Sequence, residues 1–210
     1  MAHDVYVPAA LALTAILAAA ALPACGGREA VSYEEEVLAS RAAKDERFSR
    51  ASDSPIPPDQ RAELLPLAYF PPDASYRVAA VLEVASPGSE LVMPTSTGKL
   101  RRMVRVGRLK FTLKGQSMAL GAFAEASAHD VERLFVPFTD KTTGTETYAG
   151  GRYLELDPTP TGVYIIDFNR AFNPYCAYNP EYDCPYPPPE NRLPVPVRAG
   201  ERMREPGRTK

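Results

Sequence analysis

Tryptophan is absent from this chain of 210 residues, and histidine occurs only twice. His3 lies in an N-terminal segment that we predict to be cleaved, so His129 is the one histidine of the predicted mature chain. It stands in a polar stretch before a predicted strand, where an exposed loop histidine is the simplest interpretation. A Ser/His/Asp or Cys/His catalytic group built on His129 stays open, because such partners meet in space rather than in sequence.

The chain also lacks an excess of positive charge. Its 24 Lys and Arg are outnumbered by 26 Asp and Glu, which gives a formal net charge of -2. Domains that bind nucleic acid usually present a basic face. The arginines near the C-terminus alternate with Glu201 and Glu205, as expected of a solvated end. We therefore predict no nucleic-acid partner.

Cofactor motifs and metal-ligand sets are missing as well. Gly150-Gly151 lacks the strand–turn–helix setting of a phosphate or dinucleotide loop. Structural zinc normally takes four Cys or His ligands, whereas Cys176 and Cys184 have no His beside them. Three acidic residues offer oxygen ligands for a hard cation, although such residues are usually solvated in turns: Asp140, Glu146 and Asp167. We predict no cofactor and no metal site.

The N-terminal segment has the layout of a signal peptide. An apolar, Ala-rich run from Val5 to Ala24 is followed by Cys25, and Leu22-Pro23-Ala24-Cys25 resembles a bacterial lipobox, in which the Cys is lipid-modified and becomes the new N-terminus. We predict a signal peptide over residues 1–24 and a lipid anchor at Cys25. The alternatives are a secretory leader cut after Ala21 and a retained anchor, since about 20 apolar residues can span a membrane.

A lipid anchor implies a place in the cell. It would hold the protein at the bacterial cell envelope, with the membrane as one partner. Gly26 is not the Asp that often marks retention in the inner membrane. We therefore predict the outer membrane, facing the periplasm, in a Gram-negative cell.

A charged helix is predicted to follow the anchor, within a tether that spans residues 25–53. Ser32 and Glu35 form a capping-box pattern at the start of the run from Val31 to Ala51. The apolar positions of this run are few: Val37, Leu38 and Phe48. The helix is therefore predicted to be peripheral. Residues 52–75, rich in Pro and Leu, are predicted to wrap a sheet edge or a barrel end.

From Tyr76 the pattern changes to short β-like runs separated by turn residues. Leu109, Phe111 and Leu113 alternate with polar residues, which is the period of a half-buried strand. Seven strands are predicted: Tyr76–Val84, Met103–Val106, Arg108–Leu113, Ser117–Glu125, Arg133–Phe138, Arg152–Leu156 and Val163–Phe168. This spacing favours one mainly β domain over residues 54–200, an antiparallel β-sandwich or barrel, before a polar tail at 201–210.

A long Pro- and Tyr-rich loop follows the last predicted strand. The loop contains two Asn-Pro steps, and each is followed by a Tyr and then by a Cys. The two cysteines are Cys176 and Cys184. So many rings would expose a large apolar area in a solvated linker, so we expect an ordered loop packed on the β domain. The run Leu193–Val197 can add an edge strand, where Pro is tolerated.

The three cysteines support an exported protein. If Cys25 carries lipid, Cys176 and Cys184 remain as an even pair, and an oxidising compartment permits a disulfide between them. We predict that bond. The competing interpretation is a nucleophilic Cys176 thiolate, which needs an activating neighbour.

Several motifs together resemble a known family. They are Lys44-Asp45 with Phe48, Tyr69-Phe70, Tyr76-Arg77-Val78, Leu134-Phe135-Val136-Pro137-Phe138 with Asp140, Glu146-Thr147-Tyr148 with Gly150-Gly151-Arg152-Tyr153, and Asp167-Phe168-Asn169 through Asn173-Pro174-Tyr175-Cys176-Ala177-Tyr178-Asn179 to Glu190-Asn191. They are similar to the bacterial and archaeal family called domain of unknown function 1684. The resemblance implies a single domain and brings no activity, ligand or catalytic residue.

Two functions are compatible with these observations. The first is an envelope lipoprotein whose β domain binds a small molecule or an envelope protein. The candidate ligand-binding residues are Asp167, Asn169, Arg170, Asn173, Tyr175, Glu190 and Asn191. The alternative is an enzyme, for example a hydrolase, in which Asp167, Asn169, Arg170, Tyr175 and Glu190 orient a substrate and move protons.

Overall fold

The fold lies in the unit Val31–Lys210. The computed structural model describes residues 1, 3, 31–86, 89–126 and 133–204. Apart from Met1 and His3, the predicted signal peptide lies outside the described residues, as do Cys25 and His129. None of the helices in the described ranges is both long and apolar enough to cross a membrane.

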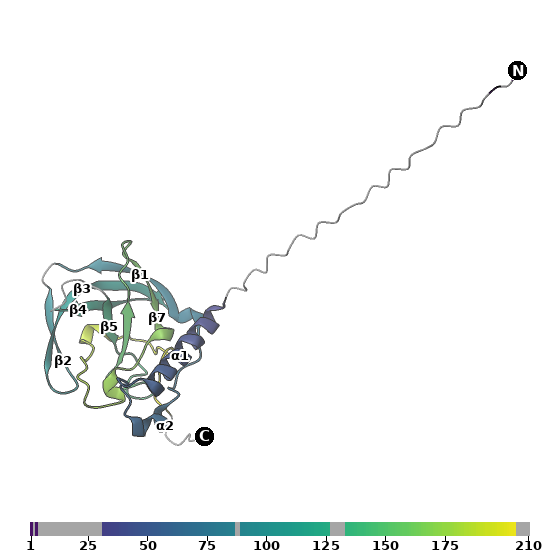
Figure 1. Cartoon of the computed structure of the whole chain (residues 1–210). Coiled ribbons are helices and arrows are strands. Elements are labelled where there is room, and N and C mark those ends of the chain that lie inside the picture. The colour runs from purple at the N-terminus through teal and green to yellow at the C-terminus, as the bar shows by residue number, and fades with distance from the viewer. Residues whose placement is uncertain (2, 4–30, 87–88, 127–132, 205–210) are drawn as a thin grey trace. The chain divides into compact units, whose positions relative to one another are not determined.

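One antiparallel sheet of seven strands dominates the fold and curls into a half-barrel (Figure 1). The strands are β1 (Arg77–Val84), β2 (Glu90–Pro94), β3 (Leu100–Leu113), β4 (Gln116–Glu125), β5 (Leu134–Phe138), β6 (Arg152–Leu156) and β7 (Val163–Asp167). Their order is β6-β5-β4-β3-β1-β7, and β2 pairs with β3 beside this path. The mainly antiparallel β fold predicted from the alternation is confirmed.

Strand β3 runs without a break through the position where two separate strands were predicted. The ladder with β4 shifts register between Arg105 and Gly107, which is a β-bulge rather than a turn. A Cβ atom at Gly107 would collide with the carbonyl oxygen of Glu83 on β1, so glycine here lets two backbones approach. Strand β2 was missed, because it is short and ends in Pro94.

The concave side of the sheet holds the main core. Its central residues include Leu109, Leu120, Val136 and Ile166, all fully buried. The chain after the sheet completes this core with Leu193, Val197 and Ala199. The edge strand predicted over Leu193–Val197 does not form. That segment bonds to the chain near β5 through single backbone contacts, such as the Leu193 amide to the Thr139 carbonyl, and its side chains fill the half-barrel.

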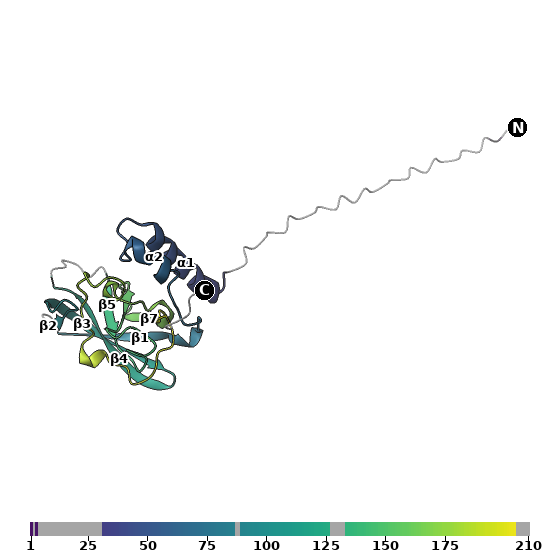
Figure 2. The same cartoon turned by 90° about the horizontal axis from the view of Figure 1, so that it is seen from below.

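Helix α1 (Tyr33–Arg50) and the short helix α2 (Arg61–Leu64) lie together at one side of the sheet (Figure 2). The predicted capping box is confirmed, with Ser32 accepting from the Glu35 amide and Glu35 accepting from the Ser32 amide. The helix buries Val37, Arg41 and Phe48, whereas Leu38 is exposed. Arg41 donates to the Phe70 carbonyl at 2.8 Å, so loop segments help to hold α1.

The Pro- and Tyr-rich loop is ordered and packed, as predicted. Short 3₁₀ turns at Phe168–Arg170, Tyr175–Ala177 and Pro189–Asn191 bend it across the domain. Phe48 of α1 stacks edge-on against two of its rings, Tyr175 and Tyr178. The chain beyond the loop differs from the predicted solvated tail, because Glu201 is 1% exposed and bonds to Lys44 and Tyr178.

Candidate functional site

A cavity of about 540 Å³ lies where the loop crosses the convex face of the sheet. Alternation and register place Met103, Glu125, Phe135 and Glu155 on this face, opposite the core. The cavity, here called the aromatic cavity, is lined by Lys44, Arg47, Arg101, Met103, Ala124, Glu125, Arg133, Phe135, Tyr153, Glu155, Phe172, Pro174, Tyr175, Tyr182, Asp183, Cys184 and Pro185. Helix α1, four strands or strand ends and the loop therefore all contribute to it.

Aromatic rings in edge-to-face contact form much of its wall. Tyr153 packs against Phe135 with ring centroids 4.7 Å apart, and against Phe172 at 6.0 Å. Tyr175 and Tyr182 form a second such pair at 5.2 Å. The Tyr153 hydroxyl donates to the Pro185 carbonyl at 2.5 Å, which locks the loop to β6. Rings held in this way offer a stiff apolar surface at little further entropic cost.

Most of the charges around the aromatic cavity are paired. Arg101 forms ion pairs with Asp183 at 3.2 Å and with Glu125 at 3.5 Å. Hydrogen bonds from Thr95 and Thr97 lower the pKa of Asp183 to about 2, so this carboxylate stays charged beside Arg101.

Two cations come from α1. Lys44 pairs with the buried Glu201 and lies 5.1 Å from the Phe172 ring centroid. Arg47 is exposed, lies over the Phe48 ring, and has no ion pair with an acidic residue of the described ranges. The aromatic cavity thus joins an apolar wall to one guanidinium without an acidic partner.

The two loop cysteines meet at the edge of this cavity. They are free thiols, so the predicted disulfide is not present in the structure. The Cys176 amide donates to the Cys184 sulfur at 3.2 Å, so the second sulfur caps a turn of the loop instead of bonding to the first. Cys184 lines the cavity and is buried, whereas Cys176 is half-buried beside it.

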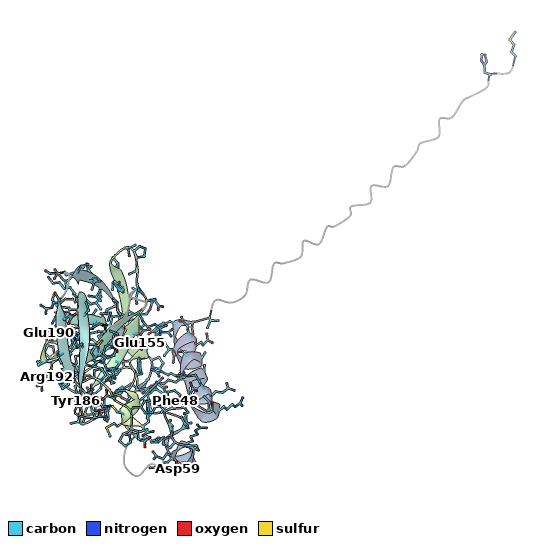
Figure 3. The ribbon with its side chains drawn as sticks, turned by 60° about the vertical axis from the view of Figure 1, so that its left-hand side comes forward. Phe48, Asp59, Glu155, Tyr186, Glu190 and Arg192 are labelled. Atoms are coloured by element: carbon cyan, nitrogen blue, oxygen red, sulfur yellow. The ribbon has the colours of Figure 1, made fainter. Side chains whose placement is uncertain are left out.

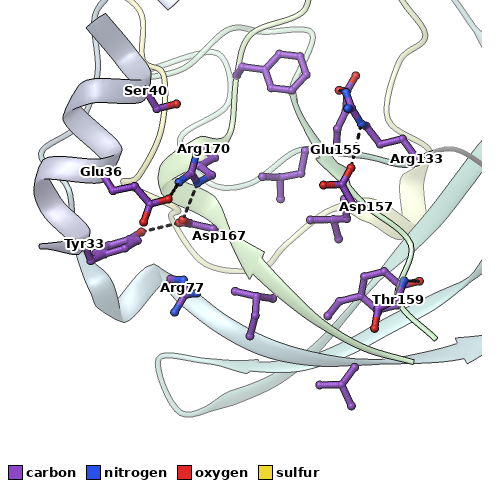
Figure 4. Close-up of a pocket in the computed structure, with 16 residues that line it drawn as sticks. Tyr33, Glu36, Ser40, Arg77, Arg133, Glu155, Asp157, Thr159, Asp167 and Arg170 are labelled. Carbon is purple, nitrogen blue, oxygen red and sulfur yellow. Dashed lines mark hydrogen bonds and ion pairs between the residues drawn. The ribbon is translucent and has the colours of Figure 1, made fainter. Parts of the chain in front are cut away.

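A second, more polar cavity of about 750 Å³ lies between β6, β7 and α1 (Figure 4). Strands β6 and β7 end the sheet order without pairing to each other, so the half-barrel stays open here. Tyr33 donates to Asp167 at 2.8 Å, and Arg170 approaches the same carboxylate at 3.3 Å. Burial, and then the bond to Asp167, raise the pKa of Tyr33 to about 12. Tyr33 therefore acts here as a neutral donor.

Three of the candidate residues from the sequence meet in this second region. Asn169 donates to the Tyr33 hydroxyl and to the Asp73 carbonyl, both at 2.8 Å, and its amide bonds to Asp167 at 3.0 Å. Its side chain therefore binds the backbone of the segment 52–75, which was predicted to wrap the sheet edge. Asp167 and Arg170 line the cavity, and Arg170 also pairs with Glu36 of α1.

The other candidates lie elsewhere. Tyr175 lines the aromatic cavity, and Asn173 borders a third cavity of about 190 Å³ with its Oδ1 atom unpartnered. Glu190 pairs with Arg105 at 2.5 Å, far from Phe48 and α1 (Figure 3). Asn191 is fully buried, and its side chain bonds only to backbone atoms of β4 and β5. The five residues of the enzyme hypothesis thus do not all lie at one site. A hydrolase stays a prediction.

The acidic residues considered for a hard cation do not meet either. Asp140 pairs with Arg152 at 2.9 Å, and Glu146 with Arg198 at 2.8 Å. Asp167 is held by Tyr33 and its own turn. Across the described residues, no group of three or more His, Cys, Asp or Glu side chains is arranged to hold a metal ion.

Several lining residues were not singled out by the sequence. Arg47, Arg101, Tyr153 and Tyr182 come from elements up to 135 positions apart in the chain, and only the fold assembles them. One local signal existed, since Lys44 and Arg47 lie three residues apart on one helix face beside Phe48.

The fold and its cavities define a class: a single curled β half-barrel closed by a peripheral helix and a long aromatic loop. The chain belongs to the family described as "Protein of unknown function (DUF1684)", whose model matches residues 63–202. An uncharacterized protein of Haloarcula marismortui, solved by solution NMR, is 42% identical, with 81% of this chain and 94% of that chain covered and a TM-score of 0.64. No curated protein matches the chain.

Proposed function

We propose that this protein binds a small amphipathic anion in the aromatic cavity. The observation that carries the proposal is the combination of a ring-lined wall with Arg47, whose guanidinium has no acidic partner among the described residues. Ligand sites of this kind are mostly apolar, with a few polar groups that fix orientation, and typically enclose about 300–1,000 Å³. The volume of about 540 Å³ lies within that range.

The charges indicate the chemistry of the ligand. Arg101 is neutralised by Asp183 and Glu125, so it offers little to a further anion. Arg47 is free to receive one carboxylate, phosphate or sulfonate, and Lys44 lies nearby on the same helix. The rings of Phe135, Tyr153 and Tyr182 then face an apolar or aromatic body. We therefore infer one acidic group on an apolar skeleton.

Binding of 1-anilinonaphthalene-8-sulfonate tests the proposal, because this dye joins a sulfonate to two aromatic groups. The unaltered protein is expected to bind it saturably, with one site per chain. Arg47→Glu replaces attraction by repulsion and is expected to weaken binding about tenfold, which corresponds to about 1.4 kcal/mol. Fluorescence titration measures both affinities.

The matched control is Arg50→Glu. Arg50 is on the same helix and pairs with Glu46 at 2.9 Å, but does not line the cavity. The charge change is the same, so dye affinity is expected to stay within a factor of about two. Equal losses in both variants, or dye binding that never saturates, would show that the dye responds only to overall charge or to nonspecific surface.

We also propose that the protein is a lipoprotein of the bacterial cell envelope, anchored through Cys25. The Ala-rich run and the Leu22-Pro23-Ala24-Cys25 ending support this. Diacyl and amide-linked chains would hold it at a membrane, since each buried methylene contributes about 0.8 kcal/mol. The outer membrane, facing the periplasm, is the proposed site in a Gram-negative cell. The binding domain would then meet small molecules outside the cytoplasm.

Cys25→Ala is expected to block maturation, because the lipid is added to the Cys25 sulfur before the leader is cut. The precursor should accumulate and remain unlabelled by radioactive palmitate, whereas the unaltered protein is labelled and shortened. Cys184→Ala serves as the control, since it lies in the folded domain. Normal cleavage of the Cys25→Ala chain would favour an ordinary secretory leader instead.

A further inference from the structure

We infer that Cys176 and Cys184 form a redox-active dithiol, in which Cys176 attacks a hydroperoxide and Cys184 resolves the product. The inference goes beyond ligand binding and does not depend on it. It rests on the placement of the two sulfurs, on the hydrogen-bond donors around the first of them, and on their unequal exposure.

The surroundings of Cys176 favour its thiolate. The Tyr148 hydroxyl donates to the Cys176 sulfur at 3.8 Å. Hydrogen bonds from the Cys184 thiol, and then from Tyr148 and Ser96, lower the pKa of Cys176 to about 6 against the opposing effect of burial. The hydrogen bond between Cys184 and Cys176, and then burial, raise the pKa of Cys184. The Cys184 thiol therefore keeps its proton. A thiolate is the nucleophilic form of cysteine.

Access separates the roles of the two sulfurs. Cys176 is half-buried, so a small solute reaches it, whereas Cys184 is 7% exposed and faces the aromatic cavity. A compact oxidant such as a hydroperoxide fits this arrangement better than the disulfide of another protein. Cys184 lies against the Cys176 turn, within reach of an intermediate formed there.

The chemistry has two steps. The Cys176 sulfur attacks the terminal oxygen of the hydroperoxide, the O–O bond breaks, and the departing alkoxide takes a proton to leave as an alcohol. Cys176 is then a sulfenic acid, oxidised by two electrons. The Cys184 sulfur next attacks the Cys176 sulfur and displaces the hydroxyl group of the sulfenic acid, which leaves as water with the Cys184 proton. The product is a Cys176–Cys184 disulfide, which an external dithiol reduces back.

The structure thus corresponds to the reduced state of the pair. In this state the Cys184 sulfur accepts from the Cys176 amide, and Cys184 lines the cavity wall. The sequence-based disulfide and the free thiols of the structure are then two states of one site.

Peroxide treatment of the reduced full chain tests the inference. After addition of hydrogen peroxide and quenching with N-ethylmaleimide, peptide mass spectrometry is expected to find Cys176 joined to Cys184, with Cys25 resolved as a separate peptide. Cys184→Ser should instead trap a dimedone adduct on Cys176. In Cys176→Ser, oxidation of Cys184 should be at least tenfold slower, because Cys184 is only 7% exposed.

A second measurement isolates the activating contact. The pH profile of Cys176 alkylation by iodoacetamide is expected to have its midpoint below the usual thiol pKa of about 8.5 in the unaltered protein. Tyr148→Phe removes one donor and should move that midpoint upward, whereas Tyr164→Phe, on β7, should not. Equal oxidation rates of the two cysteines, or an unchanged midpoint in Tyr148→Phe, would overturn the assignment. Dye affinity of Cys176→Ser is expected to be unchanged, so this result and the ligand-binding result can fail separately.

Discussion

Replacement of Arg152 by Met is expected to lower the free energy of unfolding by about 3–5 kcal/mol, the usual cost of breaking a buried ion pair from one side. Arg152 is 1% exposed and pairs with Asp140, whose side chain is fully buried. Its guanidinium also donates to the carbonyls of Val197, Ala199 and Glu201. One side chain thus joins β6 to the C-terminal segment that completes the core.

The loss has a clear physical origin. Burial lowers the pKa of the Arg152 guanidinium, and Asp140 offsets that effect. Without the cation, the Asp140 carboxylate keeps only its bonds from the Thr142 and Val197 amides and the Thr142 hydroxyl. Three carbonyls also lose a donor, and an unpartnered buried polar group costs about 1–3 kcal/mol. Chemical denaturation followed by circular dichroism measures the change.

Arg102→Met on β3 is the matched control. Arg102 pairs with Glu90 at 2.5 Å, but its side chain is 70% exposed. Exposed ion pairs contribute about 0.2–1 kcal/mol, so a small loss is expected. If Arg152→Met were no more destabilising than Arg102→Met, the C-terminal segment would not depend on the buried pair.

Asn191→Ala is expected to destabilise the protein by about 3 kcal/mol, because three buried backbone groups lose their partner. The side-chain oxygen of Asn191 accepts from the Gly121 amide at 2.6 Å. Its nitrogen donates to the Gly121 carbonyl at 2.9 Å and to the Pro137 carbonyl at 2.6 Å. Strands β4 and β5 share only one paired position, Phe123 with Phe135, so this amide bridges a gap in the ladder.

Thermal and denaturant unfolding of Asn191→Ala should be compared with Asn179→Ala. Asn179 belongs to the same loop, but its side chain accepts only the exposed Glu181 amide, so its loss is expected to be below about 1 kcal/mol. Equal stability in the two variants would mean that water replaces the Asn191 bridge. Retained dye binding by a folded Asn191→Ala protein would further separate this residue from the ligand site.

Asn191 also shows how a polar residue in a distinctive motif can mislead. The sequence presents an amide beside Glu190 in an aromatic loop, which suits ligand binding as well as it suits structure. The sequence does not distinguish a buried amide that satisfies three backbone groups from an amide that binds a ligand. Only the position of the Gly121 and Pro137 backbone distinguishes them.

Local interactions account for what could be predicted. The Ser32–Glu35 capping box and the alternation of Leu109, Phe111 and Leu113 involve residues a few positions apart. Such contacts depend on neighbouring residues in the sequence rather than on the tertiary fold, so the sequence alone can predict them. The mainly β class follows from the alternation, and the packed loop was predicted from the number of its rings. The family model confirms the family resemblance.

The sites depend on contacts that no local pattern contains. Gly107 lies between two strands predicted as separate, but the structure has one strand there, with a bulge at a close approach of β1. Glu201 was predicted to lie in a solvated tail. It is instead buried and pairs with Lys44 of α1, which is distant in the sequence.

The aromatic cavity arises in the same way, since it brings Arg47 together with Tyr153 and Tyr182 from distant elements. The sequence by itself determined which elements form and which faces are apolar. Sheet register and the course of the loop determined which side chains meet, because those depend on the packing of the whole domain.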